Sequence, residues 1–128
     1  MANMMQQKTF QNIFNEVIKC LPSEWGIVVI YLEYGDNAYS YAFYVKVNGK
    51  YINGFDIPGS SEKQIYDSFK KIDRIILADR KASKDLLWSN MTMVVSADGT
   101  MHADYDYTDL SEGAYKYKKK WKEKYLSE

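Results

Sequence analysis

The chain has few of the residues on which most catalytic and metal sites depend. It contains one cysteine and one histidine among 128 residues. Cys20 therefore has no partner for an intramolecular disulfide and is compatible with a reducing compartment. A nucleophilic triad needs a base beside a serine or a cysteine, and nothing in the sequence brings His102 to Cys20. The zinc spacings CxxC and HExxH are absent as well. These absences argue against a hydrolase and against a structural zinc domain.

Glycine, proline and long apolar runs are also scarce. The seven glycines are scattered and mark turns, so they do not form a phosphate-binding loop. The longest strongly apolar run, residues 27–32, is far too short to span a membrane. Residues 1–9 are polar, and we expect neither a signal peptide nor membrane association. Without repeats or linkers, residues 1–128 are expected to form one domain with its own core.

Charge is balanced overall but unevenly placed. The 17 basic and 17 acidic residues remove any global argument for nucleic-acid binding. Residues 20–45 hold three acids and residues 98–112 hold five, and neither stretch contains lysine or arginine. Residues 116–128 hold six lysines and two glutamates. Composition alone favours the explanation that these charged stretches are ordinary solvated surfaces. The alternative explanation is that the acidic stretches form a surface that binds a partner.

The spacing of apolar residues predicts a first helix that ends before Pro22. Its apolar positions follow the pattern of an amphipathic helix: Phe10, Ile13, Phe14, Val17, Ile18 and Leu21. The residue before a proline is pushed out of the helical region, which ends the helix. Cys20 lies off the centre of this stripe and is expected to be a small packing residue.

Two groups of strands surround a second helix. Residues 25–34 predict a buried strand and residues 39–47 a half-buried one, and Asn48-Gly49 is a hairpin signal before a short strand at 51–52. Ser60 or Ser61 can cap the second helix, which should continue to about residue 84. Residues 91–96 and 100–107 predict another hairpin, and a helix follows from residue 111. The order is helix, three strands, helix, two strands, helix. We predict an α+β fold in which an antiparallel sheet carries its helices mainly on one face.

Acids and tyrosines alternate at the end of the second hairpin, in Asp104-Tyr105-Asp106-Tyr107. Because side chains alternate across a strand, the two aspartates share one face and the two tyrosines the other. We expect Tyr105 and Tyr107 to be core and the aspartates to be candidates for contact with a partner. The segment 87–110 around them contains no lysine or arginine.

Two other interpretations of the acids are weaker. His102, Asp104 and Asp106 share a strand face and could converge on a cation, but three ligands without a fourth do not outweigh a simple polar row. Paired carboxylates also serve as acid and base in glycoside hydrolysis, yet no cleft that would separate their pKa values is evident. We therefore predict no metal, no cofactor and no enzymatic activity.

The carboxy-terminal half resembles the YezG-like family of bacterial immunity proteins. The resemblance depends on the order of several short motifs: Trp88-Ser89-Asn90-Met91-Thr92, Ser96-Ala97-Asp98-Gly99, Asp104-Tyr105-Asp106-Tyr107, Asp109-Leu110 and Lys124-Tyr125-Leu126. The amino-terminal half fits more loosely, through Leu21-Pro22, Glu24-Trp25 and Asp56-Ile57-Pro58.

The resemblance implies a cytoplasmic antitoxin that binds a nuclease toxin exported by the type VII (Esx/LXG) route, without chemistry of its own. A nuclease must present lysine and arginine to phosphates, so complementary carboxylates would favour association. The lysine-rich end would repel such a partner and is expected to face away from it. The element order also resembles that of type III secretion chaperones, which is the alternative function. The oligomeric state stays open. The predicted partner-binding residues are Asp104, Asp106, Asp109, Asp98, Glu33 and Asp36.

Overall fold

The structure is a computed structural model that describes residues 7–35, 38–82, 87–110 and 114–127. Its fold is α+β, and its elements follow the predicted order. The helices and strands are α1 (Gln7–Val17), β1 (Ile27–Gly35), β2 (Ala38–Val47), β3 (Lys50–Asn53), α2 (Glu62–Ala82), β4 (Asn90–Ser96), β5 (Met101–Asp106) and α3 (Ala114–Tyr125). Short 3₁₀ turns occupy Ile18–Cys20 and Gly54–Asp56. The fold class and the element order are thus confirmed.

The chain divides into two compact units, each built from two separate stretches of sequence. The first unit combines Met1–Ser23 with Phe55–Leu87 and contains α1 and α2. The second combines Glu24–Gly54 with Trp88–Glu128 and contains the sheet and α3. The candidate surface lies wholly within the second unit.

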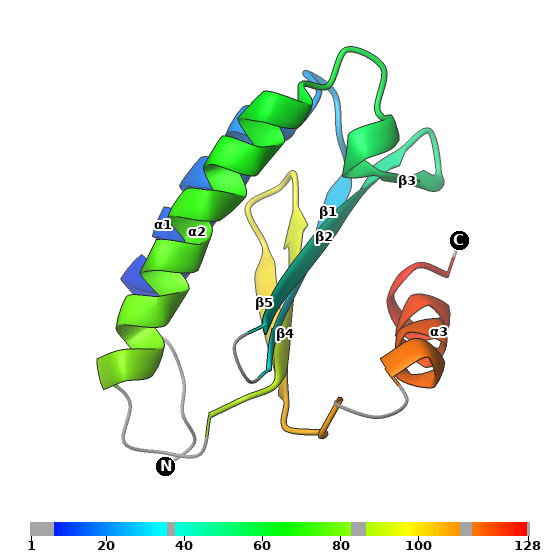
Figure 1. Cartoon of the computed structure of the whole chain (residues 1–128). Coiled ribbons are helices and arrows are strands. Elements are labelled where there is room, and N and C mark those ends of the chain that lie inside the picture. The colour runs from blue at the N-terminus through cyan, green and yellow to red at the C-terminus, as the bar shows by residue number, and fades with distance from the viewer. Residues whose placement is uncertain (1–6, 36–37, 83–86, 111–113, 128) are drawn as a thin grey trace. The chain divides into compact units, whose positions relative to one another are not determined.

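In the first unit, α1 and α2 run side by side in opposite directions (Figure 1). The apolar stripe of α2 is buried at Ile65, Phe69, Ile72 and Ile76. Ser61 is the cap, because its Oγ accepts a hydrogen bond of 3.2 Å from the amide of Gln64.

The first helix ends sooner than predicted. α1 stops at Val17 and a tighter 3₁₀ turn follows, which leaves Ile18 48% exposed instead of on the buried stripe. A 3₁₀ turn has three residues per turn, so it rotates the next side chain away from the face that an α-helix would give it. Leu21, before Pro22, is extended as expected.

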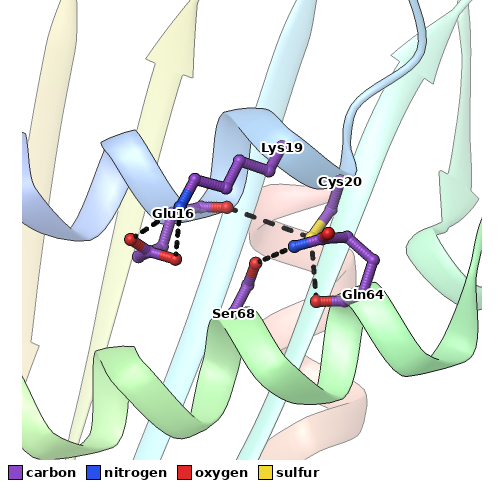
Figure 2. A network of polar contacts seen from close by, with 5 residues as sticks. All are labelled: Glu16, Lys19, Cys20, Gln64 and Ser68. Atoms are coloured by element: carbon purple, nitrogen blue, oxygen red, sulfur yellow. Dashed lines mark hydrogen bonds and ion pairs between the residues drawn. The ribbon is translucent and has the colours of Figure 1, made fainter.

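Cys20 closes this end of α1 against α2. Its thiol lies 3.9 Å from the carbonyl oxygen of Gln64 and 4.0 Å from that of Glu16 (Figure 2). Gln64 in turn donates a hydrogen bond of 2.8 Å to the hydroxyl of Ser68. Burial raises the pKa of the Cys20 thiol, which favours the neutral form. Cys20 is buried, as expected for a small packing residue.

The second unit contains a five-stranded antiparallel sheet in the order β3-β2-β1-β4-β5. Its hairpins are visible in Figure 1. Asn48 and Gly49 have φ angles of 53° and 80°, so both adopt the left-handed conformation that a tight two-residue turn requires. β1 lies in the middle and is buried on both faces, from Val28 to Leu32.

The side chains of β1 on one face meet α3. Val29 and Tyr31 form a buried cluster with Trp121, and Ile27, Tyr44, Tyr51, Val94, Tyr117, Tyr125 and Leu126 pack around it. The rings of Tyr31 and Trp121 contact edge to face, with centroids 5.0 Å apart. Burial of this apolar and aromatic surface fixes α3 over the strands that carry the predicted acids.

Candidate partner-binding surface

The strand register brings three of the six predicted acids onto the face that α3 covers. Glu33 of β1 pairs with Asn90 of β4, and Asn90 pairs with Asp106 of β5. The next row toward the centre of the sheet joins Tyr31, Thr92 and Asp104. Because residues in register point to the same face, the structure joins acids that are far apart in the sequence. We call the six residues of these two rows the acidic face.

Asp106 is the most heavily bonded of these acids. Its Oδ2 accepts a hydrogen bond of 2.5 Å from the hydroxyl of Tyr117. Its Oδ1 accepts the amide and the hydroxyl of Thr108, at 2.8 and 2.6 Å. Burial disfavours the charged form, but the hydrogen bonds from Thr108 and Tyr117 outweigh it and lower the pKa of Asp106. The carboxylate therefore holds both α3 and the turn that follows β5.

Asp104 contacts the other end of α3. Its Oδ2 accepts a hydrogen bond of 2.5 Å from the hydroxyl of Tyr125, and its Oδ1 lies 2.8 Å from Nε2 of His102. Burial opposes ionisation here too, yet the bonds from Tyr125 and His102 prevail and lower the pKa of Asp104. Its side chain remains 38% exposed. Asp104 is thus ionised, anchored and still reachable from solvent.

Glu33 completes the acidic face on the central strand. Its Oε1 accepts a hydrogen bond of 2.5 Å from the hydroxyl of Tyr31 and lies 3.9 Å from Nζ of Lys118. Burial, and then the bond to Glu33, raises the pKa of Tyr31 far above its usual value. A lysine of α3 therefore neutralises part of the charge of the acidic face, so the lysine-rich end does not face away from this surface as expected.

Sequence reasoning did not foresee that α3 would supply these donors. Tyr117, Trp121 and Tyr125 are four residues apart, so they lie along one side of the helix. Trp121 donates a hydrogen bond of 2.8 Å from Nε1 to Oγ1 of Thr92, which satisfies both buried groups. The spacing of the three aromatic residues was the signal that could have identified this face of the helix.

The predicted roles of the alternating residues from Asp104 to Tyr107 need correction. Tyr107 was expected to be core, but it is 42% exposed. Tyr105 is only half-buried, and its ring lies 6.1 Å from that of Trp88. The aspartates do not form an open row, because hydroxyl groups from α3 reach them. Trp88, Met91 and Met93, by contrast, are fully buried.

The remaining predicted acids lie outside the acidic face. Asp98 is exposed in the β4–β5 turn, where the amide of Thr100 donates to its Oδ1 at 2.9 Å and lowers its pKa. Asp109 is exposed beyond the end of β5. Asp36 lies outside the described residues.

Open grooves lie on both sides of α3. One, of about 320 Å³, lies toward β1 and β2 and is lined by Tyr31, Tyr44, Trp121 and the lysines Lys118, Lys119 and Lys122, among others. The second, also about 320 Å³, lies toward β4 and β5 and is lined by Asn90, Asp104, Asp106, Tyr117 and the lysines Lys120 and Lys124, among others. The helix therefore covers the acidic face without sealing its margins.

Two kinds of feature are absent from the described residues. Among them, no group of three or more histidine, cysteine, aspartate or glutamate side chains is placed to hold a metal ion, and this includes His102, Asp104 and Asp106. In the same part of the chain, no helix is both long enough and apolar enough to cross a membrane.

The antiparallel sheet, its covering helix and the carboxylates at their junction place the chain in the α+β class, with an acidic surface partly covered by its own helix. The family model described as "Immunity protein YezG-like" matches residues 6–128, which span both units. The chain therefore belongs to the YezG-like family of immunity proteins. As a member of this family it has an immunity role and is not an enzyme.

Two curated relatives are similar to most of the chain. The immunity protein YezG of Bacillus spizizenii (strain ATCC 23059 / NRRL B-14472 / W23) is 26% identical over 113 residues, which cover 79% of this chain and 68% of the relative. The immunity protein YezG of Bacillus subtilis (strain 168) is 23% identical over 112 residues, covering 81% of this chain and 74% of the relative.

Proposed function

We propose that this immunity protein neutralises a cognate secreted nuclease toxin by binding it, in the cytoplasm, through its acidic and aromatic surface. The toxin would be a substrate of type VII secretion. The observation that carries the proposal is the segment 87–110, which supplies exposed and half-buried carboxylates and contains no lysine or arginine. A nuclease presents lysine and arginine to phosphates, so opposite charge would speed association and favour this partner.

The structure assigns different positions to the proposed contact residues. Asp98 and Asp109 are exposed, and Asp104 keeps an exposed edge. Glu33 and Asp106 are half-buried beneath α3. Mutation of Asp104 or Asp106 would disturb both the fold and a contact, because both residues anchor α3. Asp98 and Asp109 lie outside the acidic face, so their replacement leaves these anchors of α3 in place, and Asp36 stays a proposal from sequence.

The first experiment identifies the toxin. The gene should lie next to one that encodes a large secreted protein with a carboxy-terminal nuclease domain, and co-expression of the two should restore growth. The purified protein should also suppress nuclease activity in vitro, whereas a secretion chaperone would leave that activity unchanged. A neighbouring nuclease domain that remains fully active with excess protein would refute the proposal.

The second experiment tests the charge of the surface. The double variant Asp98→Lys and Asp109→Lys should associate with the nuclease domain at least about tenfold more slowly at low salt, with a smaller dependence on ionic strength. Glu24→Lys combined with Asp56→Lys, at two exposed acids outside segment 87–110, changes the net charge equally, so it is the matched control and should associate at close to the normal rate. Stopped-flow fluorescence would measure the rates. Equal rates for both variants would show that these two acids do not steer the toxin.

A further inference from the structure

The acidic face is already occupied by helix α3 of the same chain. Along this face, carboxylates and small polar side chains of the sheet accept hydrogen bonds from tyrosine and tryptophan. Tyr117 bonds to Asp106, Tyr125 bonds to Asp104, and Trp121 bonds to Thr92. Lys118 adds a positive charge beside Glu33. The chemistry that this surface recognises can therefore be read from its occupant: a helix that bears lysine and hydroxyl- or N–H-bearing aromatic residues.

α3 is poorly suited to stand alone. It has 12 residues, which is about the length below which an isolated helix is marginal in water. Three lysine pairs at a spacing of four residues place like charges next to one another, namely Lys116 and Lys120, Lys118 and Lys122, and Lys120 and Lys124. Trp121 is its one buried side chain among those described, and Tyr115 is 82% exposed. The helix thus depends on docking for its stability.

The fit between α3 and the acidic face is also incomplete. A groove of about 320 Å³ runs along each side of the helix. Asn90, which lines one of them, is 1% exposed, and its Nδ2 has no hydrogen-bond partner in the described structure. A buried donor without an acceptor is unfavourable, so an occupant that supplies an oxygen at this position would make a hydrogen bond that α3 does not provide.

We propose that the acidic face is the toxin-binding surface and that the toxin displaces α3 from it. A basic, aromatic helix of the toxin would then take the place of α3. This inference rests on the proposed function and names the surface and the partner element. The charge complementarity is the same as for α3, since a nuclease domain presents lysine and arginine. Displacement would expose Glu33, Asp104 and Asp106 together, which are only partly accessible in the free protein.

Hydrogen exchange of the full-length protein tests the proposal, with the nuclease domain encoded by the adjacent gene as the partner. Amides of α3 should exchange at least about fivefold faster in the complex than in the free protein, because the displaced helix loses its docking contacts. Exchange that is unchanged or slower in α3 would show that the helix stays docked and would overturn the proposal. A complex with two copies of this chain and a protected α3 would also overturn it, since a second copy's helix would occupy the face.

A pair of conservative variants provides an independent readout. Tyr125→Phe removes the hydroxyl that bonds to Asp104 but keeps the ring, so it should increase the fraction of molecules with an undocked α3. Because the helix competes with the toxin, the affinity for the nuclease domain should rise at least about threefold. Tyr115→Phe changes an exposed tyrosine on the same helix and is the matched control. Unchanged or weaker binding by Tyr125→Phe would contradict displacement. If the wild-type protein forms no complex, the proposed function itself fails, and this outcome is distinct from a complex with a protected α3.

Discussion

At the scale of single residues, the acids of this protein differ more in environment than in type. Asp98 and Asp109 are exposed, whereas Asp104 and Asp106 are half-buried and bonded to tyrosine hydroxyls. The sequence places Asp104 and Asp106 on one strand face through simple alternation, and this is correct. It could not show that a helix eight residues or more downstream would bring Tyr117 and Tyr125 to them. The same carboxylate is thus a structural anchor and a candidate contact.

The bond between Tyr117 and Asp106 should contribute measurably to stability. Tyr117→Phe removes a hydroxyl that contacts Oδ2 of Asp106 at 2.5 Å and Oδ1 of Asn90 at 3.1 Å. A half-buried hydrogen bond to a charged group is lost, so the free energy of unfolding should fall by about 1 kcal/mol. Urea denaturation followed by circular dichroism would measure it. Tyr115→Phe, on the exposed side of α3, should leave the stability within error, and equal effects of the two variants would contradict this role of Tyr117.

At the scale of elements, α3 is the part of the fold whose role the sequence left open. A helix from residue 111 onward is predicted from sequence, and α3 spans Ala114–Tyr125. The hairpin turn at Asn48-Gly49 and the second helix follow local rules for turns and caps, and both form as predicted. Local rules did not identify the strand face that α3 would cover, because that choice depends on strand order and register.

Trp121 should be the residue on which the docking of α3 depends most. Trp121→Phe removes buried ring volume and leaves the hydroxyl of Thr92, which is 2% exposed, without its indole donor. The loss of packing and of this hydrogen bond should lower the free energy of unfolding by about 2–3 kcal/mol. Thermal denaturation and the near-ultraviolet dichroism of the tyrosines would report the change. A variant as stable as the wild type would mean that α3 contributes little to the fold.

At the scale of the whole molecule, opposite charges are separated along the chain but combined in one unit. The acids of β5 and the lysines of α3 both belong to the second unit, while the net charge of the protein is zero. Each unit is built from two separate stretches of chain, so neither corresponds to a continuous half of the sequence. Because the fold interleaves the two halves, variants of the full chain are better tests of this surface than truncations.

The lowered pKa values of Asp104 and Asp106 predict a loss of stability in acid. A carboxyl whose pKa is lower in the folded state stabilises the protein at pH values above its unfolded pKa, near 3.8 for aspartate. This contribution is lost as the pH falls through the folded pKa values. Urea titrations between about pH 6 and about pH 2 would follow it. In the double variant Asp104→Asn and Asp106→Asn, the decline should be shallower, and an unchanged slope would contradict this assignment.

The sequence by itself determined the element types, their order, the left-handed turn at Asn48-Gly49 and the two-sided character of β5. These features follow from periodicity, capping and turn chemistry, which act over a few residues. Only the tertiary structure decided which acids come together and which of them contact α3. It also decided that Tyr107 is exposed. Strand register joins Glu33 to Asp106 through Asn90, and packing against Tyr31 positions Trp121. These contacts link residues distant in sequence, and their geometry depends on the folded chain as a whole.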